Sequence, residues 1–366
     1  MTANRLAELN AQGQSPWLDN LRRGWLTGGE LARWVEQGIR GLTSNPSIFQ
    51  KAISTGNDYD EQFQRVIGGG MSVPDAYWDL VVDDIRGALE LLRPVYDETD
   101  GLDGFVSVEV APDLARDSAG TEAAARELHE RIAEPNLYVK IPGTGEGIAP
   151  IRQMIAEGRS INVTLIFSLE RYAEVMEAYV SGLEAAEGDL SGISSVASFF
   201  ISRVDTEVDR RLEEIGTDAA LALRGKAAVA QAQVAYQRFL ATFSGPRWDA
   251  LVARGARVQR PLWASTSTKN PAYPSTLYVD TLIGPDTVNT MPEETVTAFL
   301  ESGTVARTVD ADPAAAETTL AQLAEVGVDL VDVASVLEEQ GVAAFVKSFD
   351  ELLGSLDAKA VELGDR

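Results

Sequence analysis

A lysine in an apolar run is the residue of this chain that most directly suggests covalent chemistry. Lys140 lies within Leu-Tyr-Val-Lys-Ile-Pro, residues 137–142, which is typical of a buried strand. Burial of a lysine disfavours its ammonium form, and the neutral amine that results can attack a carbonyl carbon and form a Schiff base. The alternative is structural, because the same lysine could form a buried ion pair with Glu109.

Glycines follow this lysine in Gly-Thr-Gly-Glu-Gly, residues 143–147. The stretch resembles a phosphate-binding loop, but the Lys-Ser or Lys-Thr pair that such a loop requires does not follow it. The dinucleotide-binding pattern is not matched either. These glycines therefore indicate a turn after the lysine strand, and the sequence predicts no nucleotide site.

The composition excludes other classes of site. The chain has no cysteine, which excludes disulfides, thiolate zinc sites and cysteine nucleophiles. Its one histidine, His129, lies in a charged helical segment and is expected on an exposed helix face. Any triad or metal site that needs histidine would have to rest on this one residue.

The formal net charge of −25 bears on partners and location. A chain this acidic repels nucleic acid and anionic membranes, so an anionic substrate would need a local cluster of cations. The N-terminus lacks the apolar segment of a signal peptide, and no run of about 18 apolar residues predicts a membrane span. We expect a soluble cytoplasmic protein, with its oligomeric state left open between monomer and homodimer.

Short apolar runs alternate with longer amphipathic stretches, which predicts parallel strands joined by helices. Eight runs are predicted as strands: residues 15–21, 41–46, 104–110, 137–142, 161–167, 194–200, 260–266 and 286–291. Their number favours an α/β fold of the (β/α)8 barrel type over the alternative, an open doubly wound sheet. We expect a single barrel domain over residues 1–366, with residues 311–366 as a C-terminal helical extension packed on the barrel.

The two faces of the predicted strands differ in character, because successive residues point to opposite sides. Along residues 161–167, one face carries Asn162, Thr164 and Ile166, and the other Ile161, Val163, Leu165 and Phe167. Parallel sheets are covered on both sides, so the polar faces are expected to point into the barrel. Chemistry in such barrels sits at the carboxyl ends of the strands. Six polar residues fall late in their runs: Asp19, Asn45, Glu109, Lys140, Asn162 and Ser198.

Four motifs, in this order, resemble those of the transaldolase family. They are GLTSNPSIF at 41–49, LYVKIPGTGEG at 137–147, INVTLIFS at 161–168 and SVASFFISRVD at 195–205. The resemblance extends over about residues 15–350 and is to the longer bacterial form, which ends in extra helices. It implies a TIM-barrel transferase of the non-oxidative pentose phosphate pathway that needs no metal or organic cofactor. The enzyme would move a dihydroxyacetone unit from sedoheptulose 7-phosphate to glyceraldehyde 3-phosphate, giving erythrose 4-phosphate and fructose 6-phosphate.

The resemblance also implies roles for the residues of these motifs. Lys140 would form the Schiff base, and Asp19 would take the proton from the C4 hydroxyl as the C3–C4 bond breaks. Glu109 and Thr164 would hold a water that moves protons while the imine forms. Residues implied in binding the dihydroxyacetone unit or lining its pocket are Thr43, Asn45, Asn162, Ser198 and Phe200.

Taken singly, these residues have structural alternatives. Asn45 precedes a proline and could form a turn, and Asp19 could cap a helix that begins near Leu21. The others could be residues of a packed barrel interior: Thr164, Asn162, Ser198 and Phe200.

The phosphate group of the substrate is assigned to cations. A guanidinium suits a phosphate dianion, and Arg203 stands at the family's position. The second cation departs from the family pattern, because the stretch after the seventh strand reads Trp-Ala-Ser-Thr-Ser-Thr-Lys-Asn-Pro. Ser267 stands two residues after Ser265, and the cation, Lys269, comes two residues later still. The resemblance then implies that Lys269 with Ser265 takes the place of the family's cation, with Ser267 as the open alternative. Alternatively, Arg203 could be an exposed residue at the start of a helix, and Lys269 could be an exposed loop residue.

Two other functions stay open. A fructose 6-phosphate aldolase of the same barrel group would release dihydroxyacetone, and a non-catalytic scaffold would only bind sugar phosphates. Asp19, Glu109 and the long chain favour transfer over release, and the intact set with Lys140 argues against a scaffold.

Overall fold

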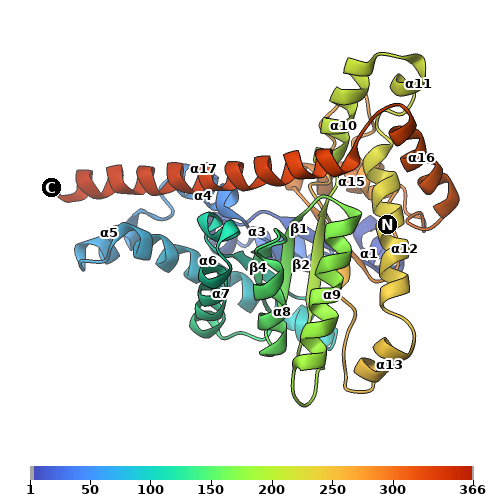
Figure 1. Ribbon diagram of the computed structural model, residues 1–366. Helices are drawn as coiled ribbons and strands as arrows, with labels where there is room; N and C mark the ends of the chain where they lie inside the picture. The colour runs from blue at the N-terminus through green and yellow to red at the C-terminus, as the bar shows by residue number, and fades with distance from the viewer. Residues whose placement is uncertain (1–3, 365–366) are drawn as a thin grey trace.

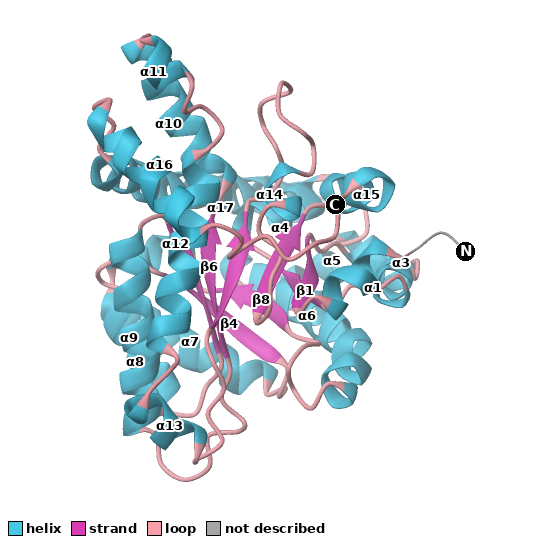
Figure 2. Cartoon of the chain, turned by 90° about the vertical axis from the view of Figure 1, so that its right-hand side faces the viewer, coloured by secondary structure: helices cyan, strands magenta, loops and turns pink. Residues whose placement is uncertain are grey.

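The computed structural model describes residues 4–364, and its centre is a closed barrel of eight parallel strands. Each strand pairs with its neighbours in the sequence, and β8 closes the barrel against β1 (Figures 1 and 2). The strands are β1 Gln14–Asp19, β2 Gly41–Thr43, β3 Val106–Glu109, β4 Leu137–Pro142, β5 Ile161–Ile166, β6 Ser195–Phe200, β7 Arg260–Ala264 and β8 Thr287–Met291. The predicted (β/α)8 barrel is therefore confirmed.

All eight predicted strands form, and most are shorter than predicted. β4 has the predicted bounds, whereas β2 ends at Thr43 instead of continuing to residue 46. The reason is local: Asn45 already serves as the N-cap of the next helix, α4, and Pro46 is its first residue. A proline is well placed there because its fixed φ suits the first helical turn.

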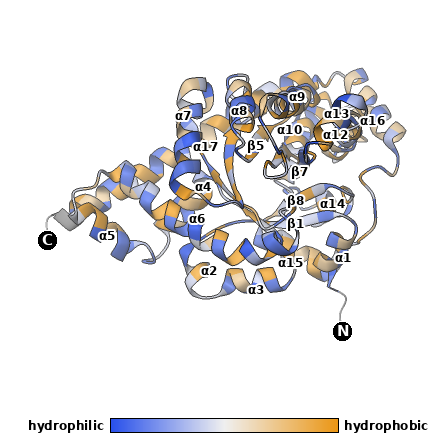
Figure 3. Cartoon of the chain, turned by 90° about the horizontal axis from the view of Figure 1, so that it is seen from below, coloured by the Kyte–Doolittle hydropathy of each residue, from blue (hydrophilic) through white to orange (hydrophobic). Residues whose placement is uncertain are grey.

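Helices surround the barrel, and hydrophobic and hydrophilic residues alternate around them, as expected for amphipathic helices (Figure 3). From the amino end they are α1 Arg5–Ala11, α2 Arg23–Thr27, α3 Glu30–Glu36, α4 Pro46–Ser54, α5 Asp60–Gly68, α6 Val73–Glu98, the 3-10 helix η1 Pro112–Arg116, α7 Ser118–Ile132, α8 Ile148–Ala156 and α9 Leu169–Ala185. They continue as α10 Ser202–Ile215, α11 Asp218–Leu221, α12 Ala227–Thr242, α13 Pro246–Val252, α14 Leu277–Asp280, α15 Glu293–Ser302, α16 Pro313–Glu325 and α17 Leu330–Gly364.

Large side chains fill the amino-terminal half of the barrel. The Trp17 ring stacks on Tyr138 with ring centroids 6.1 Å apart, and its Nε1 donates to Asp103 over 3.1 Å. Gly41 pairs with Trp17 across β1 and β2, and a Cβ at this glycine would lie 2.4 Å from the indole ring. Asp103 also forms a buried ion pair with Arg260 at 3.1 Å. This packing fills the amino-terminal end of the barrel, and the cavity described below lies at the carboxyl ends of the strands.

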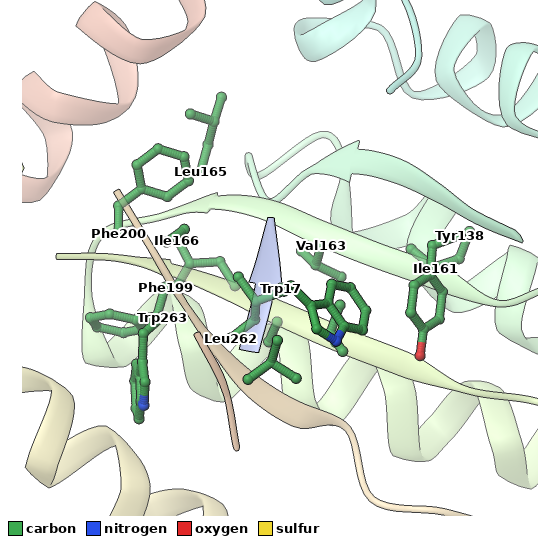
Figure 4. Close-up of a cluster of buried hydrophobic side chains, with 14 of the residues drawn as sticks. Trp17, Tyr138, Ile161, Val163, Leu165, Ile166, Phe199, Phe200, Leu262 and Trp263 are labelled. Atoms are coloured by element: carbon green, nitrogen blue, oxygen red, sulfur yellow. The ribbon is translucent and has the colours of Figure 1, made fainter. Parts of the chain in front are cut away.

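A bulge in β5 changes the faces that alternation predicts. Val163 pairs with Ala197 and Ile166 with Phe199, so three steps along β5 match two along β6. Leu165 adopts a left-handed backbone with φ of 58° inside this bulge. The assignment of Leu165 to the face of Val163, and of Ile166 to the polar face, is therefore wrong. Figure 4 shows Leu165 and Ile166 pointing in different directions.

His129 also differs from the prediction. It lies half-buried on α7 instead of on an exposed face. Burial, together with the nearby positive charge of Arg159, lowers the pKa of His129 to about 4. The imidazole is thus neutral at physiological pH, and it lies on an outer helix, away from the barrel interior.

The C-terminal helices lie against the barrel and its surrounding helices. α16 contacts α12, while α17 extends across the carboxyl-end face of the barrel and contacts α4, α6, η1 and α10 (Figure 1). Glu338 of α17 forms an ion pair with Arg116 of η1 at 2.8 Å. Within residues 4–364, no helix is long and apolar enough to cross a membrane.

Candidate active site

Lys140 and Glu109 form an ion pair inside the barrel. Adjacent strands β3 and β4 place the two residues directly opposite each other, and Lys140 Nζ lies 3.1 Å from Glu109 Oε2. Lys140 Nζ also donates a hydrogen bond to the Ser44 carbonyl oxygen over 3.2 Å. Both side chains are almost fully buried, with 6% and 1% of their surface exposed. The predicted ion pair is therefore present, at the carboxyl end of its strands.

The surroundings of Glu109 raise its pKa above the usual value for a carboxyl group. Burial raises the pKa of Glu109, the positive charge of Lys140 lowers it, and Asp19 raises it further, with a net rise. Its contact with Lys140 is an ion pair whose geometry is not that of a hydrogen bond. Among the described residues, neither Glu109 oxygen nor the buried Thr164 Oγ1 has a hydrogen-bond partner. Buried polar atoms normally have partners, so these oxygens are suited to contacts with a bound molecule.

Asp19 lies at the end of β1 and accepts a hydrogen bond from Thr43 Oγ1 over 2.7 Å. Burial raises the pKa of Asp19, while Lys140, the Thr43 hydrogen bond and Arg203 lower it, and the net shift is upward. The predicted alternative of a helix cap does not apply. Helix α2 begins at Arg23, and Arg22 occupies its N-cap.

Asn162 lies in the barrel layer of Lys140, with which it is paired across β4 and β5. Its amide nitrogen donates to Ser107 Oγ over 3.0 Å, and its oxygen accepts from Ser198 Oγ over 2.7 Å. Asn162 is fully buried, whereas Ser198 lines the cavity described below. The amide therefore fixes the orientation of the Ser198 hydroxyl, which bonds a side chain instead of the backbone.

Asn45 combines the predicted turn with a position on the cavity wall. Its Oδ1 accepts a hydrogen bond from the Ile48 backbone nitrogen over 3.0 Å and so caps α4. Capping by asparagine satisfies an otherwise unpaired amide at the helix start. The amide nitrogen of Asn45 donates no hydrogen bond within residues 4–364, so it is available to a molecule in the cavity.

Arg203 begins the helix after β6 and is half-buried. Its guanidinium lies over the Phe200 ring, 5.2 Å from the centroid. Burial lowers the pKa of Arg203 and the nearby Asp19 raises it, with a net lowering. A guanidinium keeps its charge at physiological pH. Among the described residues, Asp19 is the one charged group that shifts the pKa of Arg203, and no side-chain hydrogen bond contributes to the shift, which leaves the guanidinium donors for an anion.

Ser265 and Lys269 follow β7. The side chain of Trp263 in that strand points away from the barrel interior, packs on Phe199 and donates to the Leu282 carbonyl oxygen. Strand alternation alone would place Ser265 on the same outer face as Trp263, away from the cavity. A left-handed backbone, with φ of 57°, places it on the cavity wall, where its Oγ lies 2.9 Å from Ser202 Oγ. Lys269 is exposed, and its Nζ donates to Ser267 Oγ over 2.6 Å.

These side chains surround a cavity of about 340 Å³ at the carboxyl ends of the strands. The predicted residues that line it are Asp19, Thr43, Asn45, Lys140, Thr164, Ser198, Phe200, Arg203, Ser265 and Lys269. Glu109 and Asn162 lie behind this lining. The described residues contain no cluster of His, Asp and Glu that could hold a metal ion.

Sequence reasoning missed other lining residues. They are Asn20, Ser47, Ile48, Lys51, Ala264, Thr290, Pro292, Glu294 and Phe345, whereas Ser267, the alternative to Lys269 at the phosphate position, also lines the cavity. Helical spacing after Asn45 could have indicated Ser47, Ile48 and Lys51, which fall on one face of a helix. No local signal indicates Phe345, because it lies on α17, far along the chain from the strand motifs.

Comparison with known proteins assigns the chain to a family. Residues 16–356 match the family described as Transaldolase/Fructose-6-phosphate aldolase. The chain is 51% identical over 353 residues to a transaldolase of Thermobifida fusca, with 95% of this chain and 96% of the relative covered. It is 50% identical to a transaldolase of Mycolicibacterium smegmatis over 362 residues, which cover 96% of this chain and 98% of the relative. It is 48% identical over 370 residues to transaldolase 1 of Streptomyces coelicolor, covering 99% and 97%. The chain therefore belongs to the transaldolase/fructose-6-phosphate aldolase family.

Proposed function

We propose that this chain carries out the transaldolase reaction through a Schiff base on Lys140. A dihydroxyacetone unit passes from sedoheptulose 7-phosphate to glyceraldehyde 3-phosphate, and the products are erythrose 4-phosphate and fructose 6-phosphate. The observation that carries this proposal is the position of Lys140, whose amine lies 3.1 Å from Glu109 at the wall of the cavity. We place the reaction in the cytoplasm and in the non-oxidative pentose phosphate pathway.

The first step joins the amine to the ketose. The neutral amine of Lys140 attacks the C2 carbonyl carbon; its nitrogen then gives up one proton while the carbonyl oxygen takes one, which gives a neutral carbinolamine. The C2 hydroxyl then leaves as water, taking a second proton, and an iminium remains. Glu109 can supply and accept these protons because its raised pKa brings its two protonation states closer to neutral pH. A water held between Glu109 and Thr164 would carry the proton over the remaining distance.

The second step breaks the C3–C4 bond. The Asp19 carboxylate takes the proton of the C4 hydroxyl, the aldehyde leaves, and the bonding electrons move into the iminium to form an enamine on Lys140. The hydrogen bond from Thr43 holds Asp19 in place for this transfer. Protonated Asp19 then returns its proton to the oxygen of the acceptor aldehyde as the new bond forms.

The enamine must stay in the cavity until the acceptor arrives. The free amide nitrogen of Asn45 and the Ser198 hydroxyl are placed to hydrogen-bond its hydroxyl groups, and Asn162 orients Ser198 from behind. At the other end of the cavity, Arg203, Ser265 and Lys269 would bind the phosphate group. Phe200 forms the wall beside Arg203.

Borohydride trapping tests this mechanism. Borohydride reduces an iminium to a stable secondary amine, so addition in the presence of fructose 6-phosphate should inactivate the enzyme irreversibly. Without substrate, or in the Lys140→Arg variant, no adduct should form, because a guanidinium cannot act as the neutral amine. An acceptor aldehyde should reduce the trapped fraction. Adduct that does not depend on the acceptor, with release of free dihydroxyacetone, would instead support an aldolase.

A further inference from the structure

One face of α17 lies along the cavity. Gly341, Phe345 and Ser348 are spaced by four and three residues, so they fall on the same side of the helix. A Cβ at Gly341 would lie 3.0 Å from Leu165 Cδ2 and 3.6 Å from Arg203 Nη1. Seven residues further on, Ser348 Oγ accepts a hydrogen bond from Ser47 Oγ of α4 over 2.8 Å. This face of α17 therefore reaches from Arg203 on one side of the cavity to α4 on the other.

Phe345 lies between these two contacts. It is buried, with 5% of its surface exposed, and it lines the cavity that holds Lys140. Arg203 also lines this cavity and lies beside Gly341, one turn before Phe345 on α17, so the ring borders the path between the amine and the guanidinium. A substrate joined to Lys140 and anchored at Arg203 must pass its carbon chain along that path. An apolar ring there would contact the chain and exclude water from it.

We propose that Phe345 is a specificity-determining residue for phosphorylated sugars, and that α17 supplies the wall against which their carbon chain lies. The proposal rests on the proposed function, in which Lys140 holds C2 and Arg203 holds the phosphate. Gly341 is the positioning residue of the same wall, because the absence of a side chain lets the helix approach Arg203 and Leu165 closely.

The sequence of α17 provides a matched control. Phe349 follows Phe345 by one turn, has the same residue type and is also buried, with 8% exposed. Its ring packs edge-on against Tyr77 of α6, with centroids 5.3 Å apart, and it is not among the residues that line the cavity. Loss of either ring removes similar apolar burial, but only Phe345 can contact substrate.

The experiment compares Phe345→Ala with Phe349→Ala. We expect Phe345→Ala to raise KM for fructose 6-phosphate about tenfold, the effect of losing one good apolar contact in a binding site. Its KM for unphosphorylated fructose should change less than twofold or so, because that donor lacks the phosphate anchor that stretches the chain along the ring. Phe349→Ala should lower Tm by a similar amount and leave both KM values near wild type. Equal changes in KM for the two variants would overturn the proposal.

Two further measurements keep the outcomes distinct. Phe345→Leu retains much of the apolar volume, so it should fold where the alanine variant does not, and it should still raise KM for fructose 6-phosphate, by less than Phe345→Ala does. Borohydride trapping of the wild-type enzyme on Lys140 reports on the proposed function alone. If trapping succeeds and Phe345→Leu and Phe345→Ala both keep wild-type KM, the role of Phe345 is refuted while the Schiff base stands.

The glycine is tested in the same way. Gly341→Ala should raise KM for fructose 6-phosphate, because the added Cβ would lie only 3.0 Å from Leu165 Cδ2 and would push α17 away from the cavity. Gly354→Ala on the same helix, where an added Cβ meets nothing within 4 Å, should leave it unchanged. The same KM in both variants would remove Gly341 from the wall.

Discussion

Replacing Thr43 with valine tests how much its hydrogen bond lowers the pKa of Asp19. Burial raises the pKa of Asp19, and the 2.7 Å hydrogen bond from Thr43 is one of the contacts that lower it. A hydrogen bond to a charged group contributes roughly 1.5–3 kcal/mol, and one pKa unit corresponds to about 1.4 kcal/mol. Asp19 acts as a base only when ionised. Loss of this bond should therefore move the acid limb of kcat/KM upward by about one to two pH units.

The assay is the pH dependence of kcat/KM for fructose 6-phosphate with erythrose 4-phosphate as acceptor. Valine keeps the shape of threonine, so the substitution removes the hydroxyl with little change in packing. Thr290→Val is the matched control, because Thr290 Oγ1 lies 2.8 Å from Thr43 Oγ1 and its loss leaves the bond to Asp19 intact. An acid limb at the same pH in Thr43→Val and Thr290→Val would refute the reasoning.

Three further substitutions probe other parts of the account. Asp19→Asn should form the Schiff base but lose at least about 10²-fold in carbon–carbon cleavage. Asp19→Asn should also be more stable than wild type at pH 7. The reason is that wild-type stability falls as pH rises from the unfolded pKa of 3.8 through the raised folded pKa of Asp19. Urea unfolding that shows no gain in stability would contradict this. Arg203→Ala should raise KM for phosphorylated donors roughly tenfold to a hundredfold and change KM for unphosphorylated donors little, and equal effects would exclude a phosphate contact. Asp103→Ala leaves Arg260 buried without its carboxylate and should cost about 3–5 kcal/mol of unfolding free energy, so an unchanged urea midpoint would contradict the packing described.

The strands were predictable because their physical signal is local. A strand of a parallel barrel is buried on both faces, and its apolar run shows this directly, as residues 137–142 do. The bulge in β5 was not predictable, because residues 161–167 alternate regularly in sequence. What distinguishes Leu165 is its contact with Gly341 on a distant helix. His129 was assigned to an exposed face because its sequence neighbours are charged. Those neighbours carry no information about which other elements pack against α7.

The residues of the site divide in the same way, into those with a local sequence signal and those without one. Lys140 and Glu109 were found because strand periodicity fixes the direction of a side chain, and the barrel brings neighbouring strands into register. Residues on surrounding helices were missed because nothing local to them specifies how α4, α15 and α17 lie over the barrel. Lys51, Glu294 and Phe345 are the examples. Ser265 is an intermediate case, since its position depends on a left-handed backbone that alternation cannot anticipate.

The most direct test of the central claim is to locate the trapped substrate carbon by mass spectrometry. Reduction of the adduct with fructose 6-phosphate adds a dihydroxyacetone unit to one lysine and blocks trypsin there. The account predicts a modified tryptic peptide that runs uncleaved from Ile132 to Arg152, with the added mass on Lys140. The label on any of the other lysines, at 51, 226, 269, 347 or 359, or an unmodified peptide ending at Lys140, would contradict it.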